Sequence, residues 1–253
     1  MSRLIALDDG HGMQTPGKRT PIFKDGTKSK ETGESFMHEN EFNRAVISIL
    51  DEHLKRCGFR TLFVAPGDGD VPLKTRTDTA NQAGADLYIS VHANAVGETW
   101  GSANGIESFY YPGRVTSMKA AEAIHAQLLQ GTGLRDRGVK PANLHVLRES
   151  KMPAVLVECG FMDNLNEAKL LMSDSYREKC AEEIAKGICH YFGVAYVQRE
   201  AEYRMTKEDA NKLIDLYLKP AWGVAQQKGD EAGKQEANRL ANELRKASGQ
   251  ATQ

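Results

Sequence analysis

The chain has 253 residues, of which 40% are hydrophobic and 26% are charged, as in a globular protein with one main domain and a small appendage. Its formal net charge of −1 excludes the bulk electrostatic signature of a nucleic-acid or anionic-membrane binder. No apolar run approaches the roughly 20 residues that span a bilayer, and the short apolar run before Asp8 cannot form a signal-peptide core. We therefore expect a chain made in the cytoplasm without a conventional export route, and no nucleic-acid or membrane partner.

The first part of the chain alternates short apolar runs with longer helical patterns. The spacing of its apolar residues predicts strands over residues 3–9 and 60–64 and helices over residues 38–54 and 73–82. Residues 13–36 are rich in Lys, Thr, Gly and Pro and show little periodicity, so a long loop is expected there.

The same alternation continues through the middle of the chain. It predicts strands over residues 87–91, 105–111, 144–147 and 154–157, helices over 118–129 and 180–192, and a solvated loop over 135–140. Strands and helices that alternate in this way indicate an α/β domain with a mostly parallel central sheet flanked by helices. This domain is expected to span residues 1–196.

A change of composition marks the remainder of the chain, residues 197–253, which is enriched in Ala, Lys, Glu and Asn. A helix capped near Thr206 is expected to be kinked or interrupted at Pro220, and a second helix would carry Leu240 and Leu244. Two short apolar stripes are too thin to bury a large core alone. We expect a small C-terminal helical module that docks, binds a ligand or mediates a homo-oligomer.

Polar side chains follow three of the apolar runs, at the points where the predicted strands end. The first strand leads into His11, the central one into His92 and a later one into Glu158. Neighbouring parallel strands end at one edge of a sheet, and open α/β sheets bind ligands at that edge. We therefore expect these three side chains to converge, although the chain separates them widely.

Two histidines and a carboxylate are the ligand set of a catalytic zinc site that leaves one position open for water. Zinc lowers the pKa of that water and polarises a carbonyl, while a second carboxylate can move a proton to the departing amine. Glu39 and Glu158 both supply carboxylates, and their spacing does not decide which one binds metal. Glu39 also suits a structural role, because it lies in the first turn of a helix and complements the helix dipole.

The four cysteines form no C-x-x-C pair, which argues against a zinc knuckle or a disulfide framework. Cys159 lies beside Glu158 and is therefore the alternative candidate for a nucleophile. The other three fall within helical patterns, where a free cysteine usually packs as a small hydrophobe.

Several motifs occur in a fixed order along the chain: DDGHG at 8–12, Glu39 four residues before Asn43, SVHAN at 90–94, RGVK at 137–140 with VLR at 146–148, and PAVLVECGFMDN at 153–164. By their number, order and spacing, residues 3–193 resemble the zinc-dependent N-acetylmuramoyl-L-alanine amidases of the Amidase_3 type. Two positions depart from the family pattern: Asp9 stands where proline is usual, and Met13 where a second glycine is common.

The resemblance implies that His11, Glu39 and His92 bind Zn²⁺ and that Glu158 is the catalytic glutamate. It thereby assigns the metal-binding role to Glu39 rather than to Glu158. It implies hydrolysis of the amide between N-acetylmuramic acid and L-alanine in peptidoglycan. Without an export route the enzyme would reach the wall only after membrane failure, as a bacteriophage endolysin does; a mother-cell amidase of sporulation is the alternative. The C-terminal module would then bind the cell wall or form a homo-oligomer.

Two other functions remain compatible with the sequence. A zinc peptidase or carboxypeptidase acting on wall peptides would need an arginine for a terminal carboxylate, and Arg137 is available. A non-catalytic wall-binding protein is the second alternative. The presence of both histidines and both glutamates argues against it.

Overall fold

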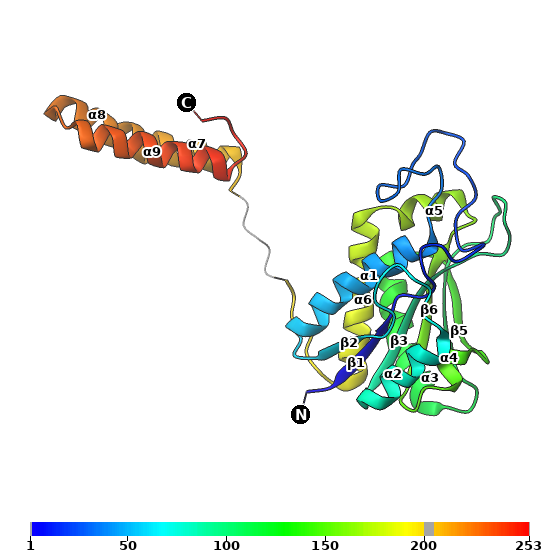
Figure 1. The fold of residues 1–253 in the computed structure, drawn as a ribbon. Coiled ribbons are helices and arrows are strands. Elements are labelled where there is room, and N and C mark those ends of the chain that lie inside the picture. The colour runs from blue at the N-terminus through cyan, green and yellow to red at the C-terminus, as the bar shows by residue number, and fades with distance from the viewer. Residues whose placement is uncertain (1, 200–204, 253) are drawn as a thin grey trace. The chain divides into compact units, whose positions relative to one another are not determined.

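The computed structural model describes residues 2–199 and 205–252, and the chain divides into two units, Met1–Arg199 and Glu200–Gln253 (Figure 1). A six-stranded sheet with strand order β2-β1-β3-β6-β4-β5 forms the centre of the first unit. Its strands are β1 (Leu4–Asp8), β2 (Arg60–Phe63), β3 (Leu87–Asn94), β4 (Ile106–Tyr110), β5 (Asp136–Pro141) and β6 (Ala154–Phe161). The first three and β6 run parallel, whereas β4 is antiparallel to β6. The predicted mostly parallel α/β sheet is therefore confirmed.

Helices cover both faces of this sheet (Figure 1). One face packs against α1 (Glu39–Arg56), α3 (Val115–Thr132) and α6 (Asp174–Phe192), and the other against α2 (Leu73–Ala83) and α4 (His145–Arg148). Along β1, Ile5 and Leu7 belong to the first core, while Leu4 and Ala6 belong to the second. Burial on both faces explains why the strands read as continuous apolar runs rather than as alternating ones.

Three segments differ from the sequence-based prediction. Residues 135–140 do not form a loop but largely coincide with β5, an edge strand whose charged side chains remain partly exposed. Residues 144–147 do not form a strand but enter the one-turn helix α4, because a short apolar run has no period that separates strand from helix. Helix α5 (Leu165–Leu171) was not expected.

The start of α1 fixes the position of Glu39, its first residue. The Glu41 carboxylate accepts a hydrogen bond from the backbone N–H of His38 at 2.8 Å, which forms half of a capping box. The backbone N–H of Glu39 donates to the carbonyl of Lys18 at 2.9 Å. The capped N-terminus of α1 and the backbone contact with the preceding loop therefore both fix the position of Glu39.

The second unit contains α7 (Lys207–Leu213), a π-helical turn η1 (Ile214–Leu218), α8 (Lys219–Lys228) and α9 (Glu231–Ala247). Thr206 caps α7 as expected, accepting from the backbone N–H of Asp209 at 3.0 Å. α7, η1 and α8 follow one another without a break, and Pro220 lies just after the widened turn η1 rather than at an interruption of the helix. Among the described residues, no helix combines the length and the apolar character that crossing a membrane requires.

Candidate metal centre

The candidate site lies at the carboxyl ends of β1, β3 and β6. His92 and Glu158 are direct partners in the β3–β6 register, so the sheet itself places the two side chains next to each other. Asp8 and Ser90 pair in the β1–β3 register. Ser90 lies on the same face of the sheet as His92, because residues two apart on a strand point to one side. The convergence expected from the strand ends is therefore present for His92 and Glu158.

Two further side chains reach this edge from outside the sheet. His11 lies in the loop after β1, and Glu39 enters from the first turn of α1. One ligand atom from each of His11, Glu39 and His92 lies within 4.8 Å of the other two. Glu39 Oε1 is 2.9 Å from His92 Nδ1, and Glu39 Oε2 is 3.5 Å from His11 Nε2. Glu39 thus lies between the two imidazoles.

A chain of hydrogen bonds determines which nitrogen of His92 faces Glu39. Asp8 is buried, and the charge and hydrogen bonds of Arg76 and Ser90 lower its pKa although burial alone would raise it. The ionised Asp8 only accepts, so the Ser90 hydroxyl donates to it at 2.8 Å. The Ser90 oxygen then accepts from His92 Nε2, 3.1 Å away. This arrangement keeps a proton on Nε2 and directs Nδ1 towards Glu39.

The pair formed by His92 Nδ1 and Glu39 Oε1 requires a positive charge. In this tautomer both atoms are acceptors, and they are 2.9 Å apart, so a proton or a cation must satisfy them. Burial alone lowers the pKa of His92, but the hydrogen bond and charge of Glu39 raise it overall. Within the described chain, Glu39 Oε2 is buried and has no hydrogen-bond partner. Two imidazoles and an unsatisfied carboxylate oxygen fit a zinc ion.

Burial gives the remaining titratable groups unusual protonation states. It lowers the pKa of His11 to about 4, so His11 is neutral at physiological pH and its lone pair is free for a metal. It also raises the pKa of Glu158 to about 8, assisted by the charge of Glu39 and opposed by that of His92. The metal-free protein therefore holds Glu158 in its protonated form at neutral pH.

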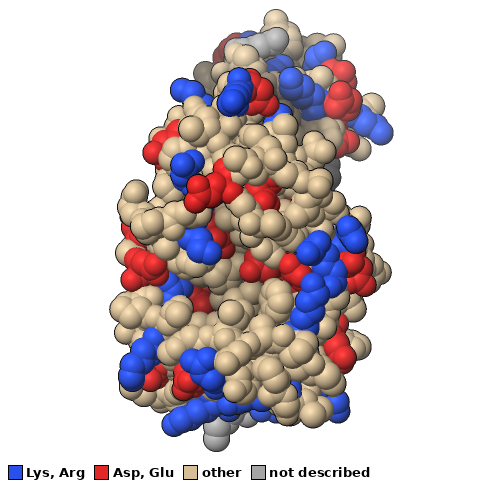
Figure 2. Space-filling model, turned by 90° about the vertical axis from the view of Figure 1, so that its right-hand side faces the viewer, with Lys and Arg blue, Asp and Glu red and all other residues tan. Residues whose placement is uncertain are grey.

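A cavity of about 570 Å³ opens onto these side chains. Its lining includes the polar side chains of Lys18, His11, His92 and Glu158 and a set of apolar side chains: Val71, Pro72, Leu73, Leu144, Val146 and Leu156. On the molecular face shown in Figure 2, Lys and Arg are interspersed with Asp and Glu, in keeping with the net charge of −1. A cavity of this volume lies within the usual range of ligand-binding pockets.

Two residues considered from the sequence are engaged elsewhere. Arg137 Nε lies 3.4 Å from Glu107 Oε1, its guanidinium lies over the ring of Phe161, and it does not line the cavity. Cys159 is fully buried on the face of β6 opposite to Glu158. Its contact with Cys180, together with burial, raises the pKa of its thiol. A buried thiol of this kind is not a nucleophile.

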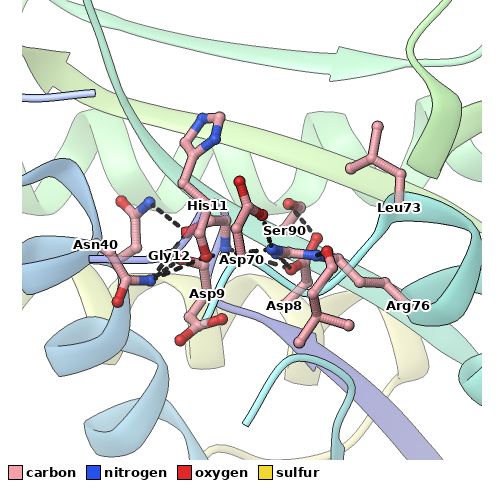
Figure 3. Close-up of polar contacts among 12 residues, drawn as sticks. Asp8, Asp9, His11, Gly12, Asn40, Asp70, Leu73, Arg76 and Ser90 are labelled. Atoms are coloured by element: carbon pink, nitrogen blue, oxygen red, sulfur yellow. Dashed lines mark hydrogen bonds and ion pairs between the residues drawn. The ribbon is translucent and has the colours of Figure 1, made fainter. Parts of the chain in front are cut away.

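The sequence did not reveal the residues that hold the site together. Arg76 is buried on α2 and donates to Asp8 Oδ1 at 2.6 Å, to Asp70 Oδ1 at 2.9 Å and to the His11 carbonyl at 3.1 Å (Figure 3). Asn40 approaches the same loop from α1 on the opposite side (Figure 3). A charged residue at a helix position usually faces solvent, so the pattern around Arg76 contained no signal of its burial.

Comparison with known proteins identifies one family and several relatives. The Amidase_3 family, described as N-acetylmuramoyl-L-alanine amidase, matches residues 5–190. N-acetylmuramoyl-L-alanine amidase CwlM of Bacillus licheniformis is 39% identical over 216 residues, which cover 83% of this chain and 78% of CwlM. The endolysin of Bacillus phage SPP1 is 35% identical over 196 residues, covering 74% of this chain and 65% of the endolysin.

A solved structure shares the fold of the first unit. The catalytic domain of CwlV, an N-acetylmuramoyl-L-alanine amidase from Bacillus (Paenibacillus) polymyxa var. colistinus, superposes with a TM-score of 0.64 at 30% sequence identity. The match covers 76% of this chain and 99% of the CwlV domain.

Gly10→Ala should disturb the site more than an ordinary glycine substitution does. Gly10 has φ of +46°, and an added Cβ would overlap the imidazole of His92. Gly17 is the matched control, because its φ is +75° but nothing lies within 4 Å of the added Cβ. In chemical denaturation, we expect Gly10→Ala to lower the free energy of unfolding by about 1–3 kcal/mol more than Gly17→Ala does. Equal losses would show that the loop moves away from His92 freely.

The raised pKa of Glu158 should make the stability of the metal-free protein depend on pH. Between its unfolded pKa near 4.5 and its folded pKa of about 8, the folded state binds the extra proton, so the Glu158 contribution falls as pH rises. Glu158→Gln cannot ionise. We expect the unfolding free energy of the wild type, measured relative to Glu158→Gln, to decrease across this range by at most about 1.4 kcal/mol per pH unit. A pH-independent difference would contradict the raised pKa.

Proposed function

The chain belongs to the N-acetylmuramoyl-L-alanine amidase family Amidase_3, and we propose that it hydrolyses the amide between N-acetylmuramic acid and L-alanine with one zinc ion. His11, Glu39 and His92 would hold the ion, and Glu158 would act as the general acid–base residue. The observation that carries this proposal is the approach of one ligand atom from each of the three side chains to within 4.8 Å of the other two. A bound zinc ion supplies an activated water and polarises the scissile carbonyl.

Glu158 is well placed to move the proton that the reaction transfers. It is the register partner of His92 and lines the cavity, and its Oε2 has no hydrogen-bond partner within the described chain. As a carboxylate it would take a proton from the attacking water, and it would then give that proton to the departing amine of L-alanine. With zinc bound, the pKa of Glu158 would fall from its metal-free value, which favours the carboxylate that the first step needs.

The neutral state of His11 and the tautomer of His92 prepare both imidazoles for the ion. His11 would bind without first losing a proton, since its pKa of about 4 keeps it neutral. His92 would bind through Nδ1, while its Nε2–H stays bonded to Ser90. A hydrogen bond on the second nitrogen orients a metal-binding histidine and raises its basicity.

The products released from peptidoglycan distinguish the alternative functions. A peptidase or carboxypeptidase would release amino acids or shorter stem peptides, whereas the amidase would release free L-alanine N-termini and leave the lactyl carboxyl groups on the glycan. The position of Arg137 beside Glu107 and outside the cavity favours the amidase, because a carboxylate clamp would have to line the cavity. A non-catalytic wall-binding protein would release neither product.

For the biological setting, we propose lysis of a bacterial cell wall by a phage endolysin. The support is the similarity to the endolysin of Bacillus phage SPP1, which extends over 74% of this chain. The test is lysis of susceptible cells from within, by expression of the chain together with a membrane-permeabilising protein.

Removing one proposed metal ligand should remove both metal and activity. We expect purified protein to contain one zinc ion per chain by elemental analysis, and His92→Ala to contain almost none and to release no L-alanine N-termini from peptidoglycan. A chelator should abolish wild-type activity and added zinc should restore it. Active wild-type protein without stoichiometric metal would overturn the proposed centre.

Changing Glu158 should separate catalysis from metal binding. Glu158→Gln keeps the size of the side chain but cannot exchange a proton, so we expect normal zinc content and a rate lower by about 10²–10⁴-fold. The matched variant Glu39→Gln should instead lose zinc. If Glu158→Gln loses zinc and Glu39→Gln keeps it, the roles of the two carboxylates are reversed.

The helical unit is proposed to target the enzyme to the wall rather than to catalyse. Its buried apolar side chains are few and mostly alanine, while several large ones remain exposed: Leu216, Tyr217, Trp222, Val224 and Leu240. A second binding module raises the local concentration of an enzyme on a polymer. Truncation after Arg199 should preserve zinc binding and hydrolysis of a soluble muropeptide but weaken sedimentation with walls and their lysis. Unchanged wall binding together with a loss of oligomers would favour homo-oligomerisation instead.

A further inference from the structure

We propose that Asn40 is a positioning residue for the metal ligand His11. Its side-chain amide fastens the loop that carries His11 to the helix that carries Glu39, and so sets the distance between two ligands of the same ion. The inference rests on the proposed zinc centre and extends it to a residue that does not touch the ion.

The backbone of His11 needs such support. Its φ of +54° lies in the left-handed region, and among the described residues it is the only non-glycine with a positive φ. A side chain with a Cβ is disfavoured there, so the conformation persists only where neighbouring groups hold it. In the extended conformation that the residue would otherwise prefer, the imidazole would point elsewhere.

Asn40 supplies this support through one buried amide group. Its Nδ2 donates to the carbonyls of Asp9 at 3.0 Å and of Gly10 at 2.9 Å, and lies 3.4 Å from the carbonyl of His11 (Figure 3). The side chain is almost completely buried, so water does not compete for these carbonyls. Three consecutive loop carbonyls are therefore gathered around a single donor.

The orientation of the amide is itself determined. Arg44, one turn further along α1, donates from its guanidinium to Asn40 Oδ1 at 2.7 Å. A guanidinium can only donate and a backbone carbonyl can only accept, so a flipped amide would lose the contacts on both of its sides. Arg44 thus fixes the orientation of the Asn40 amide, and its Nε also lies 3.8 Å from Asp9 Oδ2 in the same loop.

The position of Asn40 in the chain connects the two ligands. It directly follows Glu39 in the first turn of α1, so the same helical segment carries one ligand and grips the loop of the other. Glu39 Oε2 and His11 Nε2 are 3.5 Å apart. Without the Asn40 amide, the longer contacts of Asn43 Nδ2 with the Gly10 carbonyl, at 3.4 Å, and of Arg44 Nε with Asp9 Oδ2, at 3.8 Å, still join α1 to the loop, but they fix this separation less closely.

Arg76 also donates to the His11 carbonyl, at 3.1 Å, but it is a poor subject for the test. It neutralises the buried Asp8 as well, so its removal would leave an unpaired buried charge and affect folding broadly. Asn40 carries no charge, and each of its contacts leads to the His11 loop or to Arg44. Its removal therefore reports on the position of the loop.

The test compares Asn40→Ala with Asn81→Ala. Asn81 is a matched control on α2, because it also donates to a loop carbonyl, that of Glu149 at 2.9 Å, and accepts from a loop N–H, that of Lys151 at 2.8 Å, but its loop carries no ligand. The dissociation constant for zinc is measured in full-length protein by competition with a chromophoric chelator. We expect it to rise about 10–100-fold in Asn40→Ala, the usual effect of losing a group that orients a ligand, and to stay at the wild-type value in Asn81→Ala.

A second readout reports on geometry rather than affinity. With Co²⁺ in place of zinc, the visible absorption spectrum depends on ligand arrangement, and we expect it to change in Asn40→Ala but not in Asn81→Ala. Wild-type zinc affinity and an unchanged Co²⁺ spectrum in folded Asn40→Ala would overturn the proposal.

If Asn40→Ala does not fold, the same two measurements are made on Arg44→Met. Arg44 is partly exposed, and its replacement releases the Asn40 amide without removing it, together with the contacts of the guanidinium with Asp9, Asp68 and the carbonyl of Gly67. Weaker zinc binding and an altered Co²⁺ spectrum would support the proposal, and wild-type values would overturn it. Failure of the wild-type protein itself to bind zinc would instead reject the proposed metal centre, which keeps the two outcomes distinct.

Discussion

The arrangement of the site depends on the buried ion pair between Asp8 and Arg76. Arg76 crosses from α2 to the end of β1, and the remaining lone pairs of Asp8 accept hydrogen bonds from the hydroxyls of Tyr88 and Ser90. Breaking a buried pair by removing one partner typically costs about 3–5 kcal/mol, although an apolar replacement of both can be neutral. Its main effect here is geometric, because it orients Ser90 and, through Ser90, the imidazole of His92.

Folding places two carboxylates and two imidazoles in a small volume that is partly shielded from water. Glu39 and Glu158 raise the cost of ionising each other, and the metal-free protein relieves this by keeping Glu158 protonated and sharing a proton between Glu39 and His92. A divalent cation would remove the same conflict. The electrostatic cost is therefore confined to the residues proposed for the reaction, as is common at functional sites.

The errors of the sequence-based prediction have local physical causes. β5 pairs with β4 at the edge of the sheet, so its polar side chains stay half exposed and no apolar run marks the strand. α4 consists of a single turn whose buried pair, Val146 and Leu147, is too short to show a helical period. The direction of β4 was also not predictable, because an apolar run does not specify whether its neighbour is parallel or antiparallel.

The α/β class and the positions of His11, His92 and Glu158 after apolar strands follow from the sequence alone, because apolar periodicity is a local property of the chain. The resemblance to a family was needed to prefer Glu39 over Glu158 as a metal ligand, because a metal ligand and an acid–base residue both require a carboxylate group. The contacts of Asn40 and Arg76 with the His11 loop, and the nitrogen of His92 that faces Glu39, are visible only in the folded chain. Those contacts join residues far apart in the chain through single hydrogen bonds, which leave no periodic pattern in the sequence.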